Sequence, residues 1–306
     1  MKPVVSVVIP SYNYASFLGR ALKSLIEQTY SNWEAIIIDN YSEDNTDEVV
    51  NAFMDPRIRI LKIRNNGVIA ASRNLGIRES KGDWIAFLDA DDFWYPKKLE
   101  VCMKMIGDDD ATDVVGHDEM MVNIQTGFKR VLRHGPFQQD FYKTLLVEGN
   151  RLSPSATMVN KLFIEKNNLF FSESKAHITV EDYDYWMRIA GCDAKFKFIR
   201  SILGEYTIHG DNNIANLNLH FLNSKTLLHE HVYTIQNFTK EKDRLWKCIG
   251  VRLSLSRGFS YCSDAKLVAT FMVILRVLKK YPKLTLLHLV RRATRPVKIT
   301  FSFNRK

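Results

Sequence analysis

Four strand-like runs alternate with helical patterns near the N-terminus, and this alternation limits the fold more than any other feature of the chain. The runs are residues 4–9, 34–39, 58–63 and 84–88, all rich in β-branched and aliphatic residues. Between them, apolar residues recur at the spacing of amphipathic helices. Strands that alternate with helices in this way form right-handed βαβ units. The sequence therefore predicts an α/β fold with a mostly parallel, Rossmann-like central sheet.

The remainder of the chain divides into a mixed region and a purely helical one. The mixed region is predicted to hold a hairpin, helices and further strands, at residues 114–122 with 128–132, 137–147, 155–159, 181–190 and 196–208. From about residue 216 the pattern is helical, with no strand alternation. We therefore expect a domain of residues 1–215, with halves 1–110 and 111–215, followed by a helical C-terminal region of residues 216–306.

Basic residues are concentrated at the C-terminal end. The 306 residues carry a formal net charge of +9, and arginines and lysines gather in residues 276–306 beside apolar runs such as 267–278. Basic amphipathic helices of this kind can lie in an anionic membrane interface. Equally, they could pack on the preceding domain with their charges in solvent. No nucleic-acid module is evident, and basic residues without interleaved exposed aromatics argue only weakly for one.

Cysteine usage and the absence of long apolar runs indicate the compartment. The four cysteines are widely separated, with no Cys-x-x-Cys pair, which fits a reducing cytosol and argues against a zinc site or disulfide framework. The apolar run that follows the single lysine and Pro3 is too short for a signal peptide, and its flanking residues do not fit one. No apolar run reaches the roughly 18 residues that a spanning helix needs. We expect a cytoplasmic protein, with the C-terminal helices as the candidate for peripheral contact with the inner face of the cell membrane.

The fourth strand-like run ends in three carboxylates, in the segment Asp89-Ala90-Asp91-Asp92. Ligands of open α/β sheets bind beyond the carboxyl ends of the strands. Asp89 and Asp91 can offer hard oxygen ligands to Mn²⁺ or Mg²⁺, particularly where substrate phosphates complete the shell. An isolated Asp-x-Asp can instead cap the helix that starts near Pro96. A metal site at Asp89 and Asp91 therefore needs further evidence from other parts of the chain.

Polar residues also follow the first and second strands, at Tyr12 and at Asp39. The first turn lacks Gly-x-Gly-x-x-Gly, and the chain has no P-loop motif, so a dinucleotide cradle and a P-loop ATPase are both disfavoured. An aromatic ring at Tyr12 and a carboxylate at Asp39 could hold a nucleobase, the ring by stacking and Asp39 by accepting an imide N–H. Ordinary packing of Tyr12 and helix capping by Asp39 are the alternatives.

Further motifs occur in a fixed order between residues 4 and 213. They are Ser-Val-Val-Ile-Pro-Ser-Tyr-Asn at 6–13, Ile-Asp at 38–39, Ala-Ser-Arg-Asn at 71–74, Phe-Leu-Asp-Ala-Asp-Asp at 87–92, Glu-Asp-Tyr-Asp-Tyr-Trp at 181–186 and Tyr-Thr-Ile-His-Gly-Asp-Asn at 206–212. This series resembles family 2 glycosyltransferases of the GT-A fold, of the type that builds bacterial surface polysaccharides. Asn40 and Tyr41 depart from the resemblance, because the family usually shows a second Asp and then Gly there.

The resemblance implies a donor site in the first half of the domain and an acceptor site in the second. The donor is a nucleotide sugar, most often a UDP-sugar, and we expect a glycan acceptor that is lipid-linked. Position by position, it implies that Pro10, Tyr12 and Asp39 line the nucleoside pocket and that Arg73 assists there. Asp89 is expected on the ribose or donor-sugar side.

The resemblance also implies a metal site and a catalytic base. Asp91 is the expected ligand of Mn²⁺ or Mg²⁺, with Asp89 and His209 as further candidates. An acceptor hydroxyl has a high pKa, so a positioned carboxylate should accept its proton during attack. Asp182 is the candidate base and Glu181 the second; attack opposite the leaving group would invert the anomeric centre. The alternative for this pair is an acidic first helical turn.

Two other functions compete with a metal-dependent glycosyltransferase. A nucleotidyltransferase acting on sugar phosphates also combines a parallel sheet with carboxylates, but it should show a glycine-rich loop after the first strand. A non-catalytic sugar- or membrane-binding protein is the other, and two intact carboxylate clusters argue against it. His117, next to Asp118 and Glu119, superficially suggests a metal site, but nothing completes a zinc pattern; we expect these three residues on a solvated surface.

Overall fold

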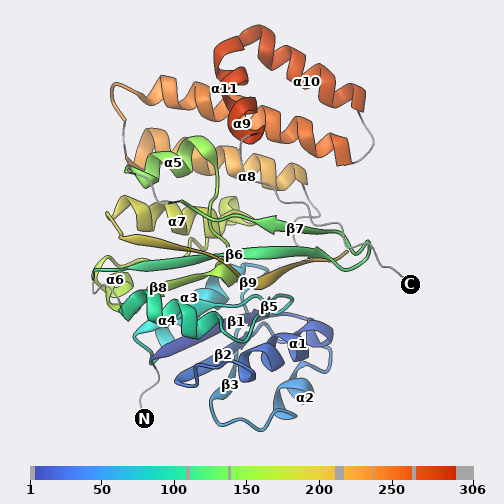
Figure 1. The fold of residues 1–306 in the computed structure, drawn as a ribbon, viewed down its shortest axis with the longest axis vertical. Helices are drawn as coiled ribbons and strands as arrows, with labels where there is room; N and C mark the ends of the chain where they lie inside the picture. The colour runs from blue at the N-terminus through green and yellow to red at the C-terminus, as the bar shows by residue number, and fades with distance from the viewer. Residues whose placement is uncertain are drawn as a thin grey trace. The chain divides into compact units, whose positions relative to one another are not determined.

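A computed structural model of the chain describes residues 4–107, 111–136, 139–210, 217–236, 238–263 and 267–293 (Figure 1). The chain forms two compact units. Of the described residues, those within 4–139 and 151–210 form unit 1, and those within 140–150 and 217–293 form unit 2. The expected boundary at residue 215 lies outside the described residues. Residues 140–150, which the sequence analysis assigned to the first domain, belong to unit 2.

Unit 1 is built on one mixed sheet. Its strands are β1 (Val5–Ser11), β2 (Trp33–Asp39), β3 (Ile58–Lys62), β4 (Trp84–Phe87), β5 (Phe93–Trp94), β6 (Val114–Asn123), β7 (Lys129–Leu132), β8 (Thr157–Asn160) and β9 (Phe196–Ile208). They follow the order β3-β2-β1-β4-β8-β6-β9-β5, with β7 paired to β6. The β3-β2-β1-β4 part is parallel, as is the pair β6 and β9, whereas β8, β5 and β7 run antiparallel to their neighbours.

The four early strands and the hairpin agree with the sequence analysis, and three details differ. Residues 196–208, which the sequence pattern divides into two strand-like segments, form one continuous strand, with register shifts against β6 next to His117 and Asp118. The segment before β8 is a 3₁₀ helix, η1 (Pro154–Ala156). The two-residue strand β5 was not predicted, because Phe93 and Trp94 are too short a run to show periodicity.

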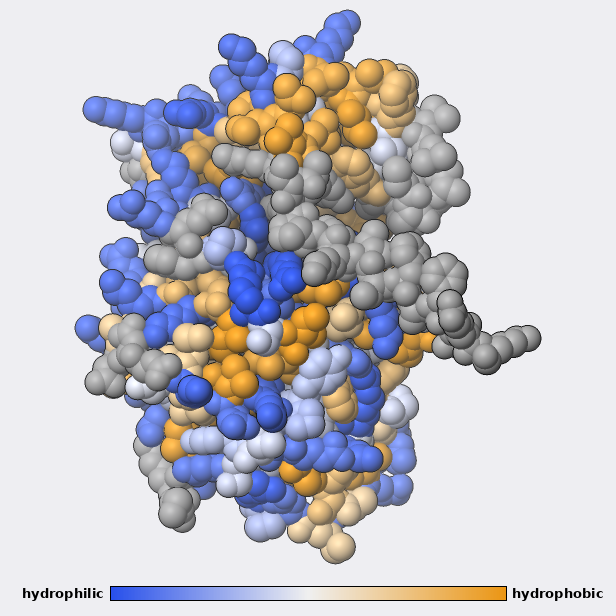
Figure 2. Space-filling view, in the orientation of Figure 1, coloured by the Kyte–Doolittle hydropathy of each residue, from blue (hydrophilic) through white to orange (hydrophobic). Residues whose placement is uncertain are grey.

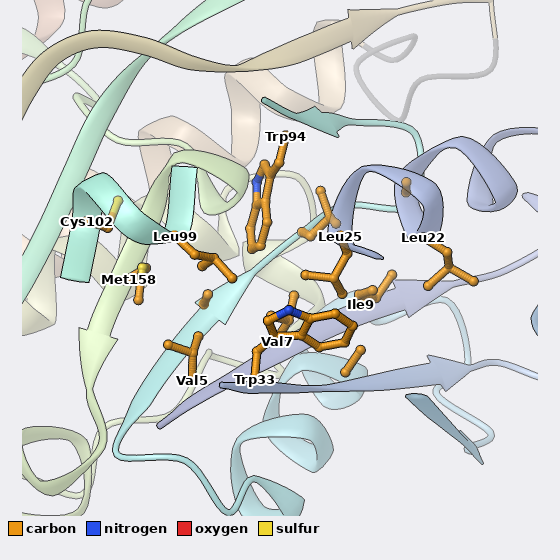
Figure 3. Packing of buried hydrophobic residues seen from close by; sticks show 14 of the residues in the cluster. Val5, Val7, Ile9, Leu22, Leu25, Trp33, Trp94, Leu99, Cys102 and Met158 are labelled. Carbon is orange, nitrogen blue, oxygen red and sulfur yellow. The ribbon is translucent and has the colours of Figure 1, made fainter. Parts of the chain in front are cut away.

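Helices cover both faces of the parallel strands, which explains why these strands lack polar alternation. The helices of unit 1 are α1 (Ala15–Ile26), α2 (Thr46–Asn51), α3 (Ile69–Glu79), α4 (Lys98–Gly107), α6 (Lys161–Lys166), α7 (Glu181–Gly191) and the 3₁₀ helix η2 (Lys175–His177). On one face, Val7 and Ile9 of β1 join Leu22 and Leu25 of α1 and Trp33 of β2 in a buried cluster (Figure 3). Helix α3 packs against β1 and β2 from the other face.

Close approach of α3 to β1 depends on Gly76. A Cβ atom at this position would lie 2.2 Å from Cγ1 of Val8, a buried residue of β1. We expect Gly76→Ala to destabilise the protein by about 1–3 kcal/mol, because α3 must move away from a packed sheet. Gly19→Ala in α1 is the matched control, since its Cβ would make an ordinary 3.6 Å contact with Val49. Urea denaturation of both variants checks this; equal midpoints would contradict it.

Unit 2 is helical in the part that the structure describes. It contains α5 (Phe141–Glu148), α8 (Leu217–Glu230), the π-helix η4 (His231–Ile235), α9 (Lys242–Ser263), α10 (Leu267–Lys280) and α11 (Pro282–Ala293). Helix α9 packs against α5, α8, α10 and α11. No helix among the described residues is both long enough and apolar enough to cross a membrane. The basic residues beyond 293 lie outside the described part of the chain.

Candidate active site

The strand register brings the expected donor residues to one edge of the sheet. Strands β2, β1 and β4 are parallel neighbours, with Ser11 paired to Asp39 and Val8 to Phe87. The Leu88 amide continues this ladder by donating to the Val8 carbonyl at 3.0 Å. Segments that follow these strands therefore leave the sheet at the same edge. This edge is where a ligand of a parallel α/β sheet is expected to bind.

Asp39 is buried and its carboxylate is already occupied. It accepts hydrogen bonds from the hydroxyl and the amide of Ser42 and from Nζ of Lys62, the last at 2.8 Å. Pro10 is buried in β1, and Tyr12 is 50% exposed just beyond it. Tyr12 is therefore accessible for stacking, whereas a base can contact Asp39 only if Ser42 or Lys62 yields. The sequence analysis missed Lys62, which pairs with Asp39 across β2 and β3.

The departure at Asn40 and Tyr41 has local structural consequences. The Asn40 side chain accepts a hydrogen bond from the Asn65 amide at 2.9 Å. Tyr41 has φ of 53°, a backbone conformation that favours glycine and that costs a bulky residue free energy. The guanidinium of Arg64 lies over the Tyr41 ring, 4.3 Å from its centroid. The exposed Tyr41 ring, covered by Arg64, thus lies two residues after Asp39 in sequence. The family resemblance predicts glycine at the position of Tyr41.

Arg73 connects the two carboxylate clusters. Its side chain is buried in α3, and its two terminal nitrogens donate to Asp89 at 2.8 Å and to Glu181 at 2.9 Å. Arg73 was predicted to assist at the nucleoside; in the structure its hydrogen bonds join Asp89, after β4, to the first turn of α7. Asp89 remains accessible, with 25% of its side chain exposed. A donor-side acid and the expected catalytic pair therefore belong to one charged network.

Glu181 and Asp182 begin helix α7 and differ in environment. Glu181 is buried, and one of its oxygens has no hydrogen-bond partner among the described residues. Asp182 is half-buried. Burial, with a further contribution from the charge of Glu181, raises the pKa of Asp182 to about 7, although Arg73 opposes the shift. A carboxyl group with a pKa close to neutral is well matched to accept a proton from a hydroxyl.

Asp91 and His209 face each other although they are far apart in the sequence. Nε2 of His209 lies 3.0 Å from a carboxylate oxygen of Asp91. The imidazole stacks on Phe17 with ring centroids 4.4 Å apart, which fixes its orientation. Burial and the nearby Asp89 raise the pKa of Asp91, because both disfavour its charged form. Asp211, from the same expected loop, lies outside the described residues.

The predicted metal site can be tested against the metal-ligating side chains that the structure brings together. Among the described residues, no three His, Cys, Asp or Glu side chains form a complete metal site. A carboxylate of Asp91 and an imidazole nitrogen of His209 do meet, and this donor pair suits Mn²⁺. Ions of this type commonly take their remaining ligands from water and substrate phosphates. The residues therefore fit a metal that is completed by a bound diphosphate, and do not fit a metal held by the protein alone.

Asp92 links the segment of residues 89–92 to Ser155 and to β9. It is buried, and it accepts hydrogen bonds from the Ser155 hydroxyl at 2.5 Å and from the Thr207 amide at 2.9 Å. The Ser155 hydroxyl in turn accepts from the Asp89 amide at 3.1 Å. Because Thr207 lies two residues before His209, this anchor also helps to place His209 beside Asp91. Neither Ser155 nor Thr207 carries a sequence signal that could have identified this role.

The expected solvated surface at His117, Asp118 and Glu119 is wrong. All three residues are buried, because β6 lies in the interior of the sheet between β8 and β9. Asp118 forms an ion pair with Arg133, and Glu119 lies 2.9 Å from Nε2 of His134. Burial lowers the pKa of His117 well below its usual value, so its ring is neutral. Partners for these charges come from β9 and from the segment after β7, which local sequence does not reveal.

The chain is similar to known proteins in sequence and in fold. The family model for glycosyl transferase family 2 matches residues 6–166, which is 161 of the 306 residues. The Escherichia coli protein WfgD, a UDP-Glc:alpha-D-GlcNAc-diphosphoundecaprenol beta-1,3-glucosyltransferase, is 28% identical over 247 residues, covering 81% of this chain and 85% of WfgD.

Solved structures show the same fold. S. aureus TarS (residues 1–349) in complex with UDP aligns with a TM-score of 0.55 at 16% identity, over 100% of this chain and 98% of that one. The mannosyltransferase PcManGT from Pyrobaculum calidifontis, in complex with GDP-Man and Mn²⁺, aligns with a TM-score of 0.59 at 17% identity, over 96% and 81%. These confirm the predicted GT-A fold. Since the family model matches more than half of its residues, this chain belongs to glycosyl transferase family 2.

Proposed function

We propose that this glycosyltransferase moves a sugar, with inversion, from a nucleoside diphosphate donor to a lipid-linked glycan acceptor in surface polysaccharide biosynthesis. The observation that carries the proposal is the Arg73 bridge, which couples the donor-side Asp89 to the Glu181–Asp182 pair. WfgD, by its name, uses UDP-Glc and a diphosphoundecaprenol-linked acceptor. The donor named for WfgD is the support for a UDP-sugar here, since the solved neighbours hold either UDP, in TarS, or GDP-Man, in PcManGT.

In the proposed reaction, each carboxylate has a separate role. Asp182 accepts the proton of the acceptor hydroxyl as its oxygen bonds to the anomeric carbon. The bond from that carbon to the diphosphate oxygen breaks on the opposite face, and the nucleoside diphosphate leaves. Arg73 holds Asp89 toward the donor sugar and balances the charge of Glu181 beside the base. Tyr12 and Pro10 border the nucleoside, with Asp39 available once Ser42 or Lys62 yields.

A divalent cation fits this proposal at Asp91 and His209. When bound, Mn²⁺ or Mg²⁺ supplies Lewis-acid stabilisation of the charge on the departing diphosphate. Asp91 and His209 are the residues that would hold it, and Asp89 lies next to them as a further candidate. Asp92 acts indirectly, since its hydrogen bonds to Ser155 and Thr207 keep the loop and β9 in register.

Metal and donor binding can be tested without turnover. UDP with Mn²⁺ should raise the melting temperature of the wild type more than UDP alone, because a ligand that prefers the folded state stabilises it. In Asp91→Ala the manganese-dependent part of this shift should vanish. Glu27→Ala, at an exposed carboxylate directly after α1, is the control and should keep the full shift. A full manganese-dependent shift in Asp91→Ala would remove Asp91 as a ligand.

The activity itself is tested by incubating the protein with a panel of UDP- and GDP-sugars and an undecaprenyl-diphosphate-linked GlcNAc acceptor. Transfer from one donor should appear as a heavier lipid-linked product in mass spectrometry. The NMR coupling of the new anomeric proton should show the configuration opposite to that of the donor. Retention of configuration would overturn the inverting mechanism, and free sugar phosphate as the only product would overturn glycosyl transfer.

A further inference from the structure

We propose that the outer faces of α10 and α11 form a docking surface for an anionic lipid bilayer. Six large apolar side chains on these two helices are 42–61% exposed, namely Phe271, Met272, Leu275, Leu286, Leu287 and Val290. We call these six residues the apolar strip. Figure 2 shows hydrophobic side chains gathered over these helices, in the upper part of the view. Single exposed apolar residues are normal on a protein surface, whereas a contiguous group marks an interaction site.

The packing of α10 on α9 uses side chains outside the apolar strip. Helix α10 uses a different side for that purpose, where Val277 packs with Val251 and Leu255 of α9, and Val273 and Ile274 lie against the same cluster. The Thr270 hydroxyl adds a 2.7 Å hydrogen bond to the Gly258 carbonyl of α9. Helix α10 is therefore apolar on two sides, and only one of them is covered by the described part of the chain.

Charge decides which partner fits the apolar strip. Arg276, Lys279, Lys280 and Lys283 are all exposed on the same two helices. The sequence from residue 267 to 293 contains no Asp or Glu. Such a surface attracts anionic lipid headgroups, whereas a second copy of the chain would present the same positive charges and be repelled. An apolar face with a basic border is the pattern of helices that lie in the membrane interface.

The lengths of α10 and α11 agree with helices that lie in the plane of the membrane interface. Helices α10 and α11 have 14 and 12 residues, fewer than the roughly 20 that a spanning helix needs. They can therefore insert their apolar side chains to a shallow depth but cannot cross the bilayer. The inference stands on this surface alone and does not require the proposed sugar transfer. A lipid-linked acceptor would give the contact a purpose.

Vesicle flotation of the full chain tests the proposal. Wild type should float with vesicles of phosphatidylcholine mixed with phosphatidylglycerol, and far less with phosphatidylcholine alone. The double variant Leu275→Ser/Leu286→Ser should lower partitioning on the order of tenfold. Leu162→Ser/Ile124→Ser is the matched control, because both residues are exposed apolar side chains of unit 1. Lys279→Gln/Lys280→Gln should lower partitioning to the anionic vesicles by a similar factor.

Circular dichroism of each variant confirms that it is folded, and light scattering gives the mass of the free protein. Equal flotation of the strip variant and the control variant would overturn the proposal. So would a wild-type dimer that the strip substitutions convert to monomer, because a second copy would then be the occupant. Neither result depends on enzymatic turnover, so this proposal and the proposed activity can fail separately.

Discussion

Replacing Asp182 with Asn is expected to lower the rate of sugar transfer by about 10²–10⁴-fold while leaving donor binding intact. The amide keeps the size and much of the hydrogen bonding of the carboxyl group but cannot accept the acceptor's proton. Donor binding should survive because the residues assigned to it lie on or just after β1, β2 and β4 and on α3, not on α7. Product formation measured by mass spectrometry, with UDP-sugar affinity from calorimetry, checks both halves of this prediction.

Glu181→Gln is the necessary companion variant, because the two acids are neighbours and either could accept the proton. If Asp182 is the base, Glu181→Gln should keep a measurable rate, lowered through the lost ion pair with Arg73. A rate that falls further in Glu181→Gln than in Asp182→Asn would assign the base to Glu181. An unchanged rate in Asp182→Asn would remove Asp182 from the mechanism altogether.

The raised pKa of Asp182 also predicts a pH dependence. The base acts as a carboxylate, so kcat/KM should rise with pH up to about 7 and then level off. Stability should respond in the opposite direction. Because the folded pKa lies above the usual value of about 4, the folded state holds more protons between these values, and stability falls as pH rises across that window. Asp182→Asn should remove the contribution of this group and make the fall shallower, which thermal melts between pH 4 and pH 8 would show.

Local sequence predicts the first half of the fold well for an identifiable reason. Strands β1, β2 and β4 are buried on both faces, so their apolar runs are nearly continuous, and their parallel neighbours require helices between them. The second half is harder because β8 enters the sheet antiparallel to both of its neighbours, β4 and β6, and because β6 carries buried charges. His117 and Glu119 read as surface residues in sequence, and only the neighbouring β9 and the segment after β7 explain their burial.

The acidic residues of the candidate site could be predicted from the sequence, but the contacts that they make with distant residues could not. Asp89, Asp91 and Asp182 are recognisable from motifs. The bridge from Arg73 to Glu181 spans 108 positions, and the contact from Asp91 to His209 spans 118. No local pattern encodes such pairs, since they arise when β9 and α7 fold back against the strand ends. Lys62 was not predicted to contact Asp39 for the same reason, because the two residues meet only when β3 pairs with β2.

Replacing Arg73 with Met is expected to destabilise the protein by about 3–5 kcal/mol, because it leaves buried carboxylates without their cation. The side chain of Glu181 is only 10% exposed, so its charge cannot be solvated in place. Arg78→Met is the matched control on the same helix. Arg78 is exposed, and its loss should change stability by no more than about 0.5 kcal/mol. Urea denaturation at neutral pH measures both variants.

Adding Glu181→Gln to Arg73→Met separates the loss of charge balance from the loss of packing. If the unpaired carboxylate is the main cost, the double variant should recover part of the lost stability, because it removes one stranded charge. The pH profile gives an independent readout. Arg73 holds the pKa of Asp182 down, so its removal should move the acidic limb of kcat/KM to higher pH. A limb that stays in place, together with no recovery in the double variant, would show that Arg73 serves packing alone and that the two carboxylate clusters act independently.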